Sequence, residues 1–178
     1  NLLPEGLLRT IVCAQHGLRE EDEPGILAAL GDDLPGAVTV SRIGDPVPGP
    51  ADDAMQSSDS TSFSKDSLIR ASIAGNVLKF SMKSRDQRLT LPGSGEYGDR
   101  IVKLPPPGEY DALVHNEFYV MSLARACGIE VPDFDVVHRE NVEIAPSAWA
   151  TTEEHAFSIA RFDRSDQGRV HMEDFCQA

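Results

Sequence analysis

The feature that most limits what this chain can fold into is a stretch over 44–67 that is rich in proline, glycine, aspartate and serine. It contains prolines at alternate positions, Pro46, Pro48 and Pro50, and a polar, serine-rich tract over 56–62. Such a composition is typical of a linker, because it offers little apolar surface to bury. We therefore predict a subdomain boundary here, with one subdomain ending within 1–43, a linker over 44–66 and a second subdomain over 67–178.

The first subdomain is predicted to contain two helices and a strand. Apolar residues recur at helical spacing behind Pro4, which suits a first helical turn, so we expect a helix over 4–18. A shorter helix is expected over 24–30, with the acidic run at 20–23 at its positive end. The segment 36–41, GAVTVS, has the character of a strand.

The second subdomain is predicted to be a sheet with one long helix. We expect strands over 67–72, 77–82, 88–91, 100–104, 134–138 and 156–161, the first four of them as an antiparallel meander. A helix is expected from Asp111, a capping residue, to about Cys127, with Gly128 just past its end. Strands, one long helix and then more strands indicate the α+β class.

The segment 93–98, GSGEYG, has the spacing of a glycine-rich nucleotide-binding loop. A dinucleotide fingerprint needs a strand before it and a helix after it, whereas both flanks here resemble strands. In protein kinases the lysine comes from the strand after the glycine hairpin, and Lys103 follows too soon for that. Glu96 would also bring a negative charge toward a phosphate. We interpret this segment as a hairpin turn.

In the predicted long helix, Glu117 is the residue whose position is hardest to explain by a purely structural role. It shares a helix face with Leu113, Val120 and Met121, which predicts that it packs against the sheet. A buried carboxylate needs a partner, and the nearest candidate in sequence is Lys103, at the end of an apolar strand. Kinases use such a pair to hold a lysine against nucleotide phosphates. The alternative is that both residues are ordinary and partly exposed.

Two further segments offer weaker signals. The small residues of SIAGN at 72–76 interrupt two strand patterns, so backbone N–H groups there could approach a phosphate, or simply form a turn. The segment IARFDR at 159–164 places a strand end before a charged loop. Its backbone could meet an adenine, and Asp163 could reach a ribose.

Composition excludes several other kinds of function. A formal net charge of −13 argues against a nucleic-acid groove, because phosphate binding relies on clustered lysine and arginine. Three widely spaced cysteines and scattered histidines support neither a disulfide framework nor a zinc site, which fits the cytoplasm. No apolar run approaches the roughly 20 residues of a transmembrane helix. The ends, without an initial Met and within an expected helix, lead us to expect a fragment of a longer protein.

Taken together and in order, these segments resemble the HipA family of bacterial serine/threonine kinases, the toxins of HipBA-type toxin–antitoxin modules. The matching segments span the chain: NLLPEG at 1–6, LPGAV at 34–38, SIAG at 72–75, IVKLP at 101–105, NEFY at 116–119, GIEVP at 128–132, RFDR at 161–164 and HMEDFCQ at 171–177. The resemblance implies the N-terminal lobe of a protein-kinase-like fold, without its helical C-terminal lobe.

The resemblance also implies a set of ATP-binding residues. Lys103 would contact the phosphates, with Glu117 orienting it. The segment with Ala160 and Phe162 would offer backbone groups to the adenine, and Asp163 would meet the ribose. The phosphate loop would comprise Ser72, Ala74, Gly75 and Asn76, and Ser72 matches the serine whose autophosphorylation ejects that loop and stops ATP binding. One departure is that Val77 stands where the family has a glutamine, although Lys79 matches a family lysine.

The implied activity is transfer of the ATP γ-phosphate, with Mg²⁺, to Ser or Thr of a cellular protein, which slows growth and is linked to persistence. The catalytic and Mg²⁺-binding aspartates are expected beyond Ala178, so this fragment alone should be inactive. The implied partners are a helix-turn-helix antitoxin of HipB type and a substrate such as an aminoacyl-tRNA synthetase, without direct nucleic-acid or membrane contact. The alternative is a truncated, non-catalytic module that binds a protein partner.

Overall fold

The computed structural model describes residues 2–41, 43, 77–93, 96–105, 112–144, 149 and 151–173. The linker predicted over 44–66 and the strand predicted over 67–72 lie outside these residues, so both stay predictions.

The two helices expected near the N-terminus are confirmed. Helix α1 (Gly6–His16) buries Leu8 and Val12, and it ends at Gly17, whose φ of 64° is a left-handed conformation that favours glycine. Helix α2 (Glu23–Ala29) begins behind Asp22, whose side chain accepts a hydrogen bond from the backbone N–H of Gly25.

The strand predicted over 36–41 does not form, and that prediction is wrong. The segment instead folds back on the end of α2, where the N–H of Val40 donates to the carbonyl oxygen of Gly31 at 3.2 Å. The two backbones approach so closely that a Cβ added to Gly31 would lie 1.8 Å from the backbone carbonyl oxygen of Val40. A φ of 67° at Gly36 also turns the chain out of an extended conformation. Local alternation alone did not reveal this close packing.

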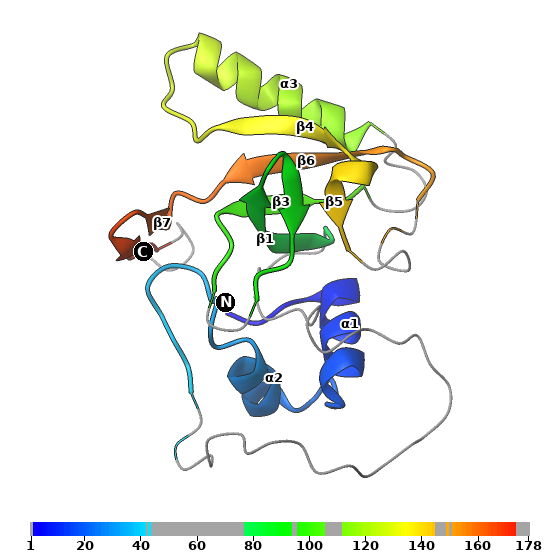
Figure 1. Ribbon diagram of the computed structural model, residues 1–178, viewed down its shortest axis with the longest axis vertical. Coiled ribbons are helices and arrows are strands. Elements are labelled where there is room, and N and C mark those ends of the chain that lie inside the picture. Colours follow the sequence, from blue (N-terminus) through cyan, green and yellow to red (C-terminus); the bar gives the residue numbers. More distant parts are fainter. Residues whose placement is uncertain are drawn as a thin grey trace.

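The central element is a six-stranded sheet with the order β4-β6-β3-β1-β2-β5 (Figure 1). Its strands are β1 (Lys79–Arg85), β2 (Arg88–Thr90), β3 (Arg100–Lys103), β4 (Phe134–His138), β5 (Val142–Glu143) and β6 (His155–Ala160). All neighbours are antiparallel except β2 and β5. A small hairpin of β7 (Arg164–Ser165) and β8 (Gly168–Arg169) follows. With its helices, this sheet confirms the predicted α+β class.

The predicted meander is wrong in one connection. A tight turn at Asp86 and Gln87, both with positive φ, joins β1 to β2, but β3 pairs with the other edge of β1. The glycine-rich segment at 93–98 therefore belongs to a connection that passes from one side of β1 to the other, and it is not a hairpin loop. Strand order depends on which long-range pairs form, and the sequence of short strands did not specify it.

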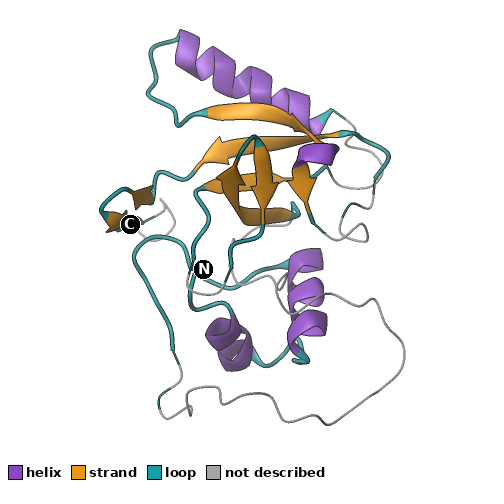
Figure 2. Cartoon of the chain, in the orientation of Figure 1, coloured by secondary structure: helices purple, strands orange, loops and turns teal. Residues whose placement is uncertain are grey.

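Helices cover the two faces of the sheet (Figure 2). Successive residues of a strand point to opposite faces of the sheet. Val102 therefore packs with Phe80 in the core between the sheet and helices α1 and α2, while Lys103 lies on the other face. On that side helix α3 (Leu113–Ala126) packs through Val114 against aromatic rings of the sheet. Its predicted end is confirmed by Gly128, with a φ of 82°. Its N-cap is Ala112, without a side-chain hydrogen bond, and Asp111 lies outside the described residues.

Candidate functional site

Lys103 and Glu117 form the ion pair that the sequence predicts. The distance from Nζ of Lys103, on β3, to Oε2 of Glu117, on α3, is 2.7 Å. The two side chains are 30% and 24% exposed, so the pair is neither free on the surface nor closed inside the core. The ammonium group also lies 5.6 Å from the ring centroid of Phe157, on β6. The pair thus holds a lysine side chain in a fixed place between the sheet and a helix.

A second lysine lies beside this pair. Lys79, on β1, is directly opposite Lys103 in the antiparallel ladder, so both side chains leave the sheet on the same face. Burial and then the charge of Lys103 lower the pKa of Lys79. The charges of Glu117 and Glu5 act on the pKa of Lys79 in the opposite direction. Two lysine side chains on one face of the sheet suit an anion such as a phosphate group. The sequence analysis noted Lys79 only as a family match, because its place beside Lys103 depends on strand register.

The segment predicted to meet an adenine begins at Ala160, the last residue of β6. The N–H of Ala160 donates to the carbonyl oxygen of Asp133 at 2.7 Å, and the N–H of Arg161 donates to that of Asp99 at 2.9 Å. Phe162 comes next and is 64% exposed. The first two N–H groups are therefore used within the fold, and Phe162 is the predicted residue that the fold presents to solvent.

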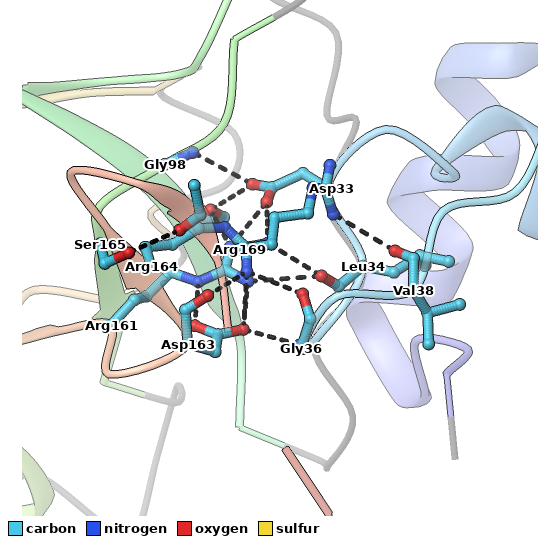
Figure 3. A network of polar contacts seen from close by, with 12 residues as sticks. Asp33, Leu34, Gly36, Val38, Gly98, Arg161, Asp163, Arg164, Ser165 and Arg169 are labelled. Carbon is cyan, nitrogen blue, oxygen red and sulfur yellow. Dashed lines mark hydrogen bonds and ion pairs between the residues drawn. The ribbon is translucent and has the colours of Figure 1, made fainter. Parts of the chain in front are cut away.

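Asp163, the predicted ribose contact, lies in a buried cluster of charges (Figure 3). Arg161 donates from Nε to Oδ1 of Asp163 at 2.9 Å and from Nη2 to Oδ2 at 2.8 Å, which is a bidentate pair. Arg164 donates from Nη1 to the same Oδ2 at 3.0 Å. The second carboxylate of the cluster is Asp33, from the segment after α2, and it accepts from both arginines. All four side chains are at most 6% exposed.

The charges of this cluster stabilise one another. Burial alone would raise the pKa of Asp163, but hydrogen bonds and charge from Arg161, the N–H of Gly36 and the charge of Arg164 lower it below its usual value. Burial alone would lower the pKa of Arg161, yet Asp163 and Asp33 raise it. The sequence analysis did not find Asp33, since nothing local marks a carboxylate whose arginine partners lie more than a hundred positions away. The ribose role of Asp163 stays a prediction.

The described glycines of the 93–98 motif have roles other than phosphate binding. The N–H of Gly93 donates to Oε2 of Glu96, whose carboxylate is also held by Arg85 at 2.6 and 2.8 Å. The N–H of Gly98 donates to Oδ2 of Asp33 at 3.1 Å. A Cβ on Gly98 would lie 2.2 Å from Oγ of Ser81 and 2.7 Å from the backbone nitrogen of Met82. Glycine is therefore required here for close packing against β1.

The remaining predicted site residues, Ser72, Ala74, Gly75 and Asn76, lie outside the described residues. Where the chain is described, no three His, Cys, Asp or Glu side chains come together as metal ligands, and no helix is long and apolar enough to cross a membrane.

Comparisons with known proteins show the family of this chain. A sequence model of the HipA-like C-terminal domain matches residues 71–178, which is more than half of the chain. The chain belongs to the HipA family. The HipA N-terminal domain also matches, over residues 1–41.

Two relatives from Sinorhizobium fredii (strain NBRC 101917 / NGR234) align with 99% of this HipA-family chain. They bear the names "Putative kinase Y4dM", which is 39% identical over 181 residues, and "Putative kinase Y4mE", which is 28% identical over 199 residues. The chain spans 42% and 44% of the lengths of these two relatives.

A solved structure shares the fold. It is a chain from the complex of the Shewanella oneidensis MR-1 toxin–antitoxin system HipA with HipB and its operator DNA. The TM-score is 0.65 at 24% sequence identity, and the match covers 100% of this chain and 42% of that one. The predicted resemblance to the HipA family is thus confirmed for family and fold.

Proposed function

We propose that this chain provides the nucleotide-binding part of a HipA-type toxin kinase, which transfers the γ-phosphate of ATP to Ser or Thr of a cellular protein and slows growth. The observation that carries the proposal is the contact of 2.7 Å between Nζ of Lys103 and Oε2 of Glu117. A glutamate from a helix that steers a strand lysine is the arrangement by which protein kinases prepare a lysine for the nucleotide phosphates.

The chemistry of the site fits ATP in two places. Lys103, with Lys79 opposite it, supplies positive charge for the phosphates. The backbone of 160–162 lies at the end of β6, where it would receive the adenine. Oδ1 of Asp163 accepts one hydrogen bond, from Arg161, and a carboxylate oxygen has two lone pairs, so it keeps the capacity to accept from a ribose hydroxyl.

We assign the other parts of the reaction to residues outside the described structure. Ser72, Ala74, Gly75 and Asn76 would form the phosphate loop, with Ser72 as the autophosphorylated residue. Mg²⁺ would neutralise the phosphates during transfer, and we expect its aspartate ligands and the catalytic aspartate beyond Ala178.

The partners follow from the family. The related Shewanella protein is part of a complex with HipB and operator DNA. We propose a HipB-type helix-turn-helix antitoxin as the partner of this protein too, and a cytoplasmic protein such as an aminoacyl-tRNA synthetase as its substrate. A net charge of −13 fits contact with DNA through the antitoxin and not through this chain.

Calorimetric titration of ATP into the protein at its natural length tests the nucleotide site. Replacing Lys103 by alanine should abolish detectable ATP binding, because it removes the positive charge held at the phosphates and leaves Glu117 unpaired. The matched control is Arg88→Ala, on β2, because Arg88 pairs with Glu143 on β5, at the edge of the sheet opposite β4 and β6. Unchanged ATP affinity in Lys103→Ala would remove this lysine from the site.

Phosphoryl transfer is tested separately. After incubation with ATP and Mg²⁺, phosphopeptide mapping of the protein at its natural length should find phosphate on Ser72. Phosphate only at other positions would overturn the loop assignment. ATP binding without any transfer would favour the alternative function, a non-catalytic module that binds a protein partner.

A further inference from the structure

We infer that Asp33 is a positioning residue for the nucleotide: it fixes the segment 161–164 in the conformation that receives the adenosine part of ATP. The inference rests on the proposed ATP site. It extends that site to the segment after α2, which contains none of the residues assigned to ATP.

Asp33 contacts three separate parts of the chain beyond residue 76 through one carboxylate. Oδ1 accepts from Nη1 of Arg161 at 2.8 Å and from Nη2 of Arg164 at 2.6 Å. Oδ2 accepts from Oγ of Ser81, on β1, at 2.5 Å and from the N–H of Gly98, before β3, at 3.1 Å. Only 1% of the residue is exposed. All four acceptor positions of the carboxylate are thus filled by donors that the chain itself provides.

The charges explain why this contact controls the segment. Two guanidinium groups, of Arg161 and Arg164, flank Phe162 and Asp163, and two carboxylates balance them. If Asp33 lost its charge, two buried cations would share Asp163 alone. A buried cation without an opposite charge to balance it is costly. The segment 161–164 would therefore rearrange toward solvent or toward the remaining carboxylate.

Backbone contacts extend the same junction. Arg164 donates from Nη2 to the carbonyl oxygen of Leu34 at 2.9 Å and from Nη1 to that of Gly36 at 3.0 Å. In return, the N–H of Gly36 donates to Oδ2 of Asp163 at 2.8 Å. The segment 33–36 is therefore the support on which the segment 161–164 lies (Figure 3). Because both arginine side chains turn toward this support, Phe162 and the nearby backbone stay on the exposed side.

The junction and the phosphate end of the site are separate. No hydrogen bond or ion pair among the described residues joins Lys103 or Glu117 to Asp33, Arg161 or Arg164. A change at Asp33 should therefore alter the adenosine end of the site and leave the phosphate end intact, which a general loss of stability would not do.

The test measures the affinities of ATP, adenosine and inorganic triphosphate by calorimetry, with the protein at its natural length. For Asp33→Asn we expect a loss of at least about tenfold for adenosine and ATP, and a change within about twofold for triphosphate. Lys103→Ala should give the opposite pattern, with triphosphate and ATP lost and adenosine retained. Asp32→Asn is the matched control, since Asp32 is adjacent and exposed.

Each outcome separates the two proposals. Equal losses of adenosine and triphosphate in Asp33→Asn, or no loss of adenosine, would overturn the positioning role while leaving the ATP site in place. Absence of ATP binding in the unchanged protein would overturn the proposed function itself. If Asp33→Asn does not fold, Ser81→Ala removes one hydrogen bond to the same carboxylate without removing a charge. Unchanged adenosine affinity in that variant would overturn the inference.

Discussion

The absence of a side chain at Gly98 lets the loop before β3 lie directly against β1. The nearest atoms to an added Cβ would be Oγ of Ser81 at 2.2 Å and backbone atoms of Met82 at 2.7 and 2.8 Å. Backbone atoms cannot move aside as the end of a flexible side chain can. The same glycine donates its N–H to Asp33, so a shift of this loop also disturbs the buried charges.

Gly98→Ala should therefore destabilise the protein by about 1–3 kcal/mol, the usual cost of forcing atoms into a packed site. The control is Gly93→Ala in the same motif, where the atoms nearest to an added Cβ are Oε2 and Cδ of the Glu96 side chain, at 3.4 and 3.9 Å. Urea unfolding followed by the fluorescence of Trp149, the only tryptophan, measures both. Equal stabilities of the two variants would contradict the packing role of Gly98.

Asp163 should make stability depend on pH in the acid range. Its pKa in the folded protein is below the usual value, mainly because Arg161 outweighs the effect of burial. The unfolded chain therefore binds a proton at higher pH than the folded chain does. The stabilisation from this carboxylate is complete above a pH of about 4 and is lost as the pH falls through the folded-state pKa.

The comparison of unchanged protein with Asp163→Asn isolates this effect, because the variant has no proton to gain at that position. The difference in free energy of unfolding should be largest at neutral pH and shrink steadily below a pH of about 4. Denaturant unfolding at a series of pH values measures it. A difference that stays constant down to pH values near 2 would show that the carboxylate is not stabilised by its charge.

At the scale of elements, α3 matters because it carries Glu117 to Lys103. Val114 is its only fully buried side chain and packs with Phe134 and Phe157. Other side chains of the helix are exposed, including Val120, which is 56% exposed although the sequence analysis placed it on the face of Glu117. Phe118 and Met121 of α3 are partly buried and pack against the same cluster. The position of α3 on the sheet thus depends on these apolar contacts together with the ion pair.

Val114→Ala should cost about 2 kcal/mol, from the lost burial of two methyl groups and the cavity that they leave. Val120→Ala is the same substitution on the same helix, and its exposed position should keep the change within about 0.5 kcal/mol. Thermal unfolding compares the two variants. A similar loss for both would mean that α3 does not dock through Val114.

The sequence analysis was correct where an element depends on local interactions and wrong where it depends on contacts between distant segments. Helix α1, helix α3 and strand β4 were predicted because their patterns are local, and the Lys103–Glu117 contact was predicted because a helix face limits where Glu117 can point. The order of β1, β2 and β3 was wrong, since strand pairing is decided between distant segments.

The charge cluster shows the same limit at the site. Asp33 follows a helix as an ordinary polar residue would, and RFDR looks like a charged surface loop. Only the folded chain brings these four charges together and buries them. A carboxylate with a distant partner leaves no local periodicity or spacing to detect.

At the scale of the whole molecule, the segment after α2 is joined to the sheet by buried charge as well as by apolar contact. The core between the sheet and helices α1 and α2 includes Phe80, Met82 and Val102 of the sheet. The charge cluster is a second junction, between the segment after α2 and the sheet. A buried ion pair is not by itself a large gain in stability, because both charges lose their hydration. Its removal from one side is costly, because the remaining charges stay buried.

Asp33→Asn should therefore lower the free energy of unfolding by about 3–5 kcal/mol, the usual effect of breaking a buried ion pair from one side. Asp32→Asn should change it by less than about 0.5 kcal/mol, since that side chain is exposed. Urea unfolding followed by Trp149 fluorescence and by far-ultraviolet circular dichroism measures both variants.

The same two substitutions in an Arg164→Met background test the cause of the loss. With one buried cation removed, Asp33→Asn should cost less, because fewer charges are left unbalanced. An equal cost in both backgrounds would mean that Asp33 acts through its other partners, Arg161, Ser81 and Gly98, and not through Arg164.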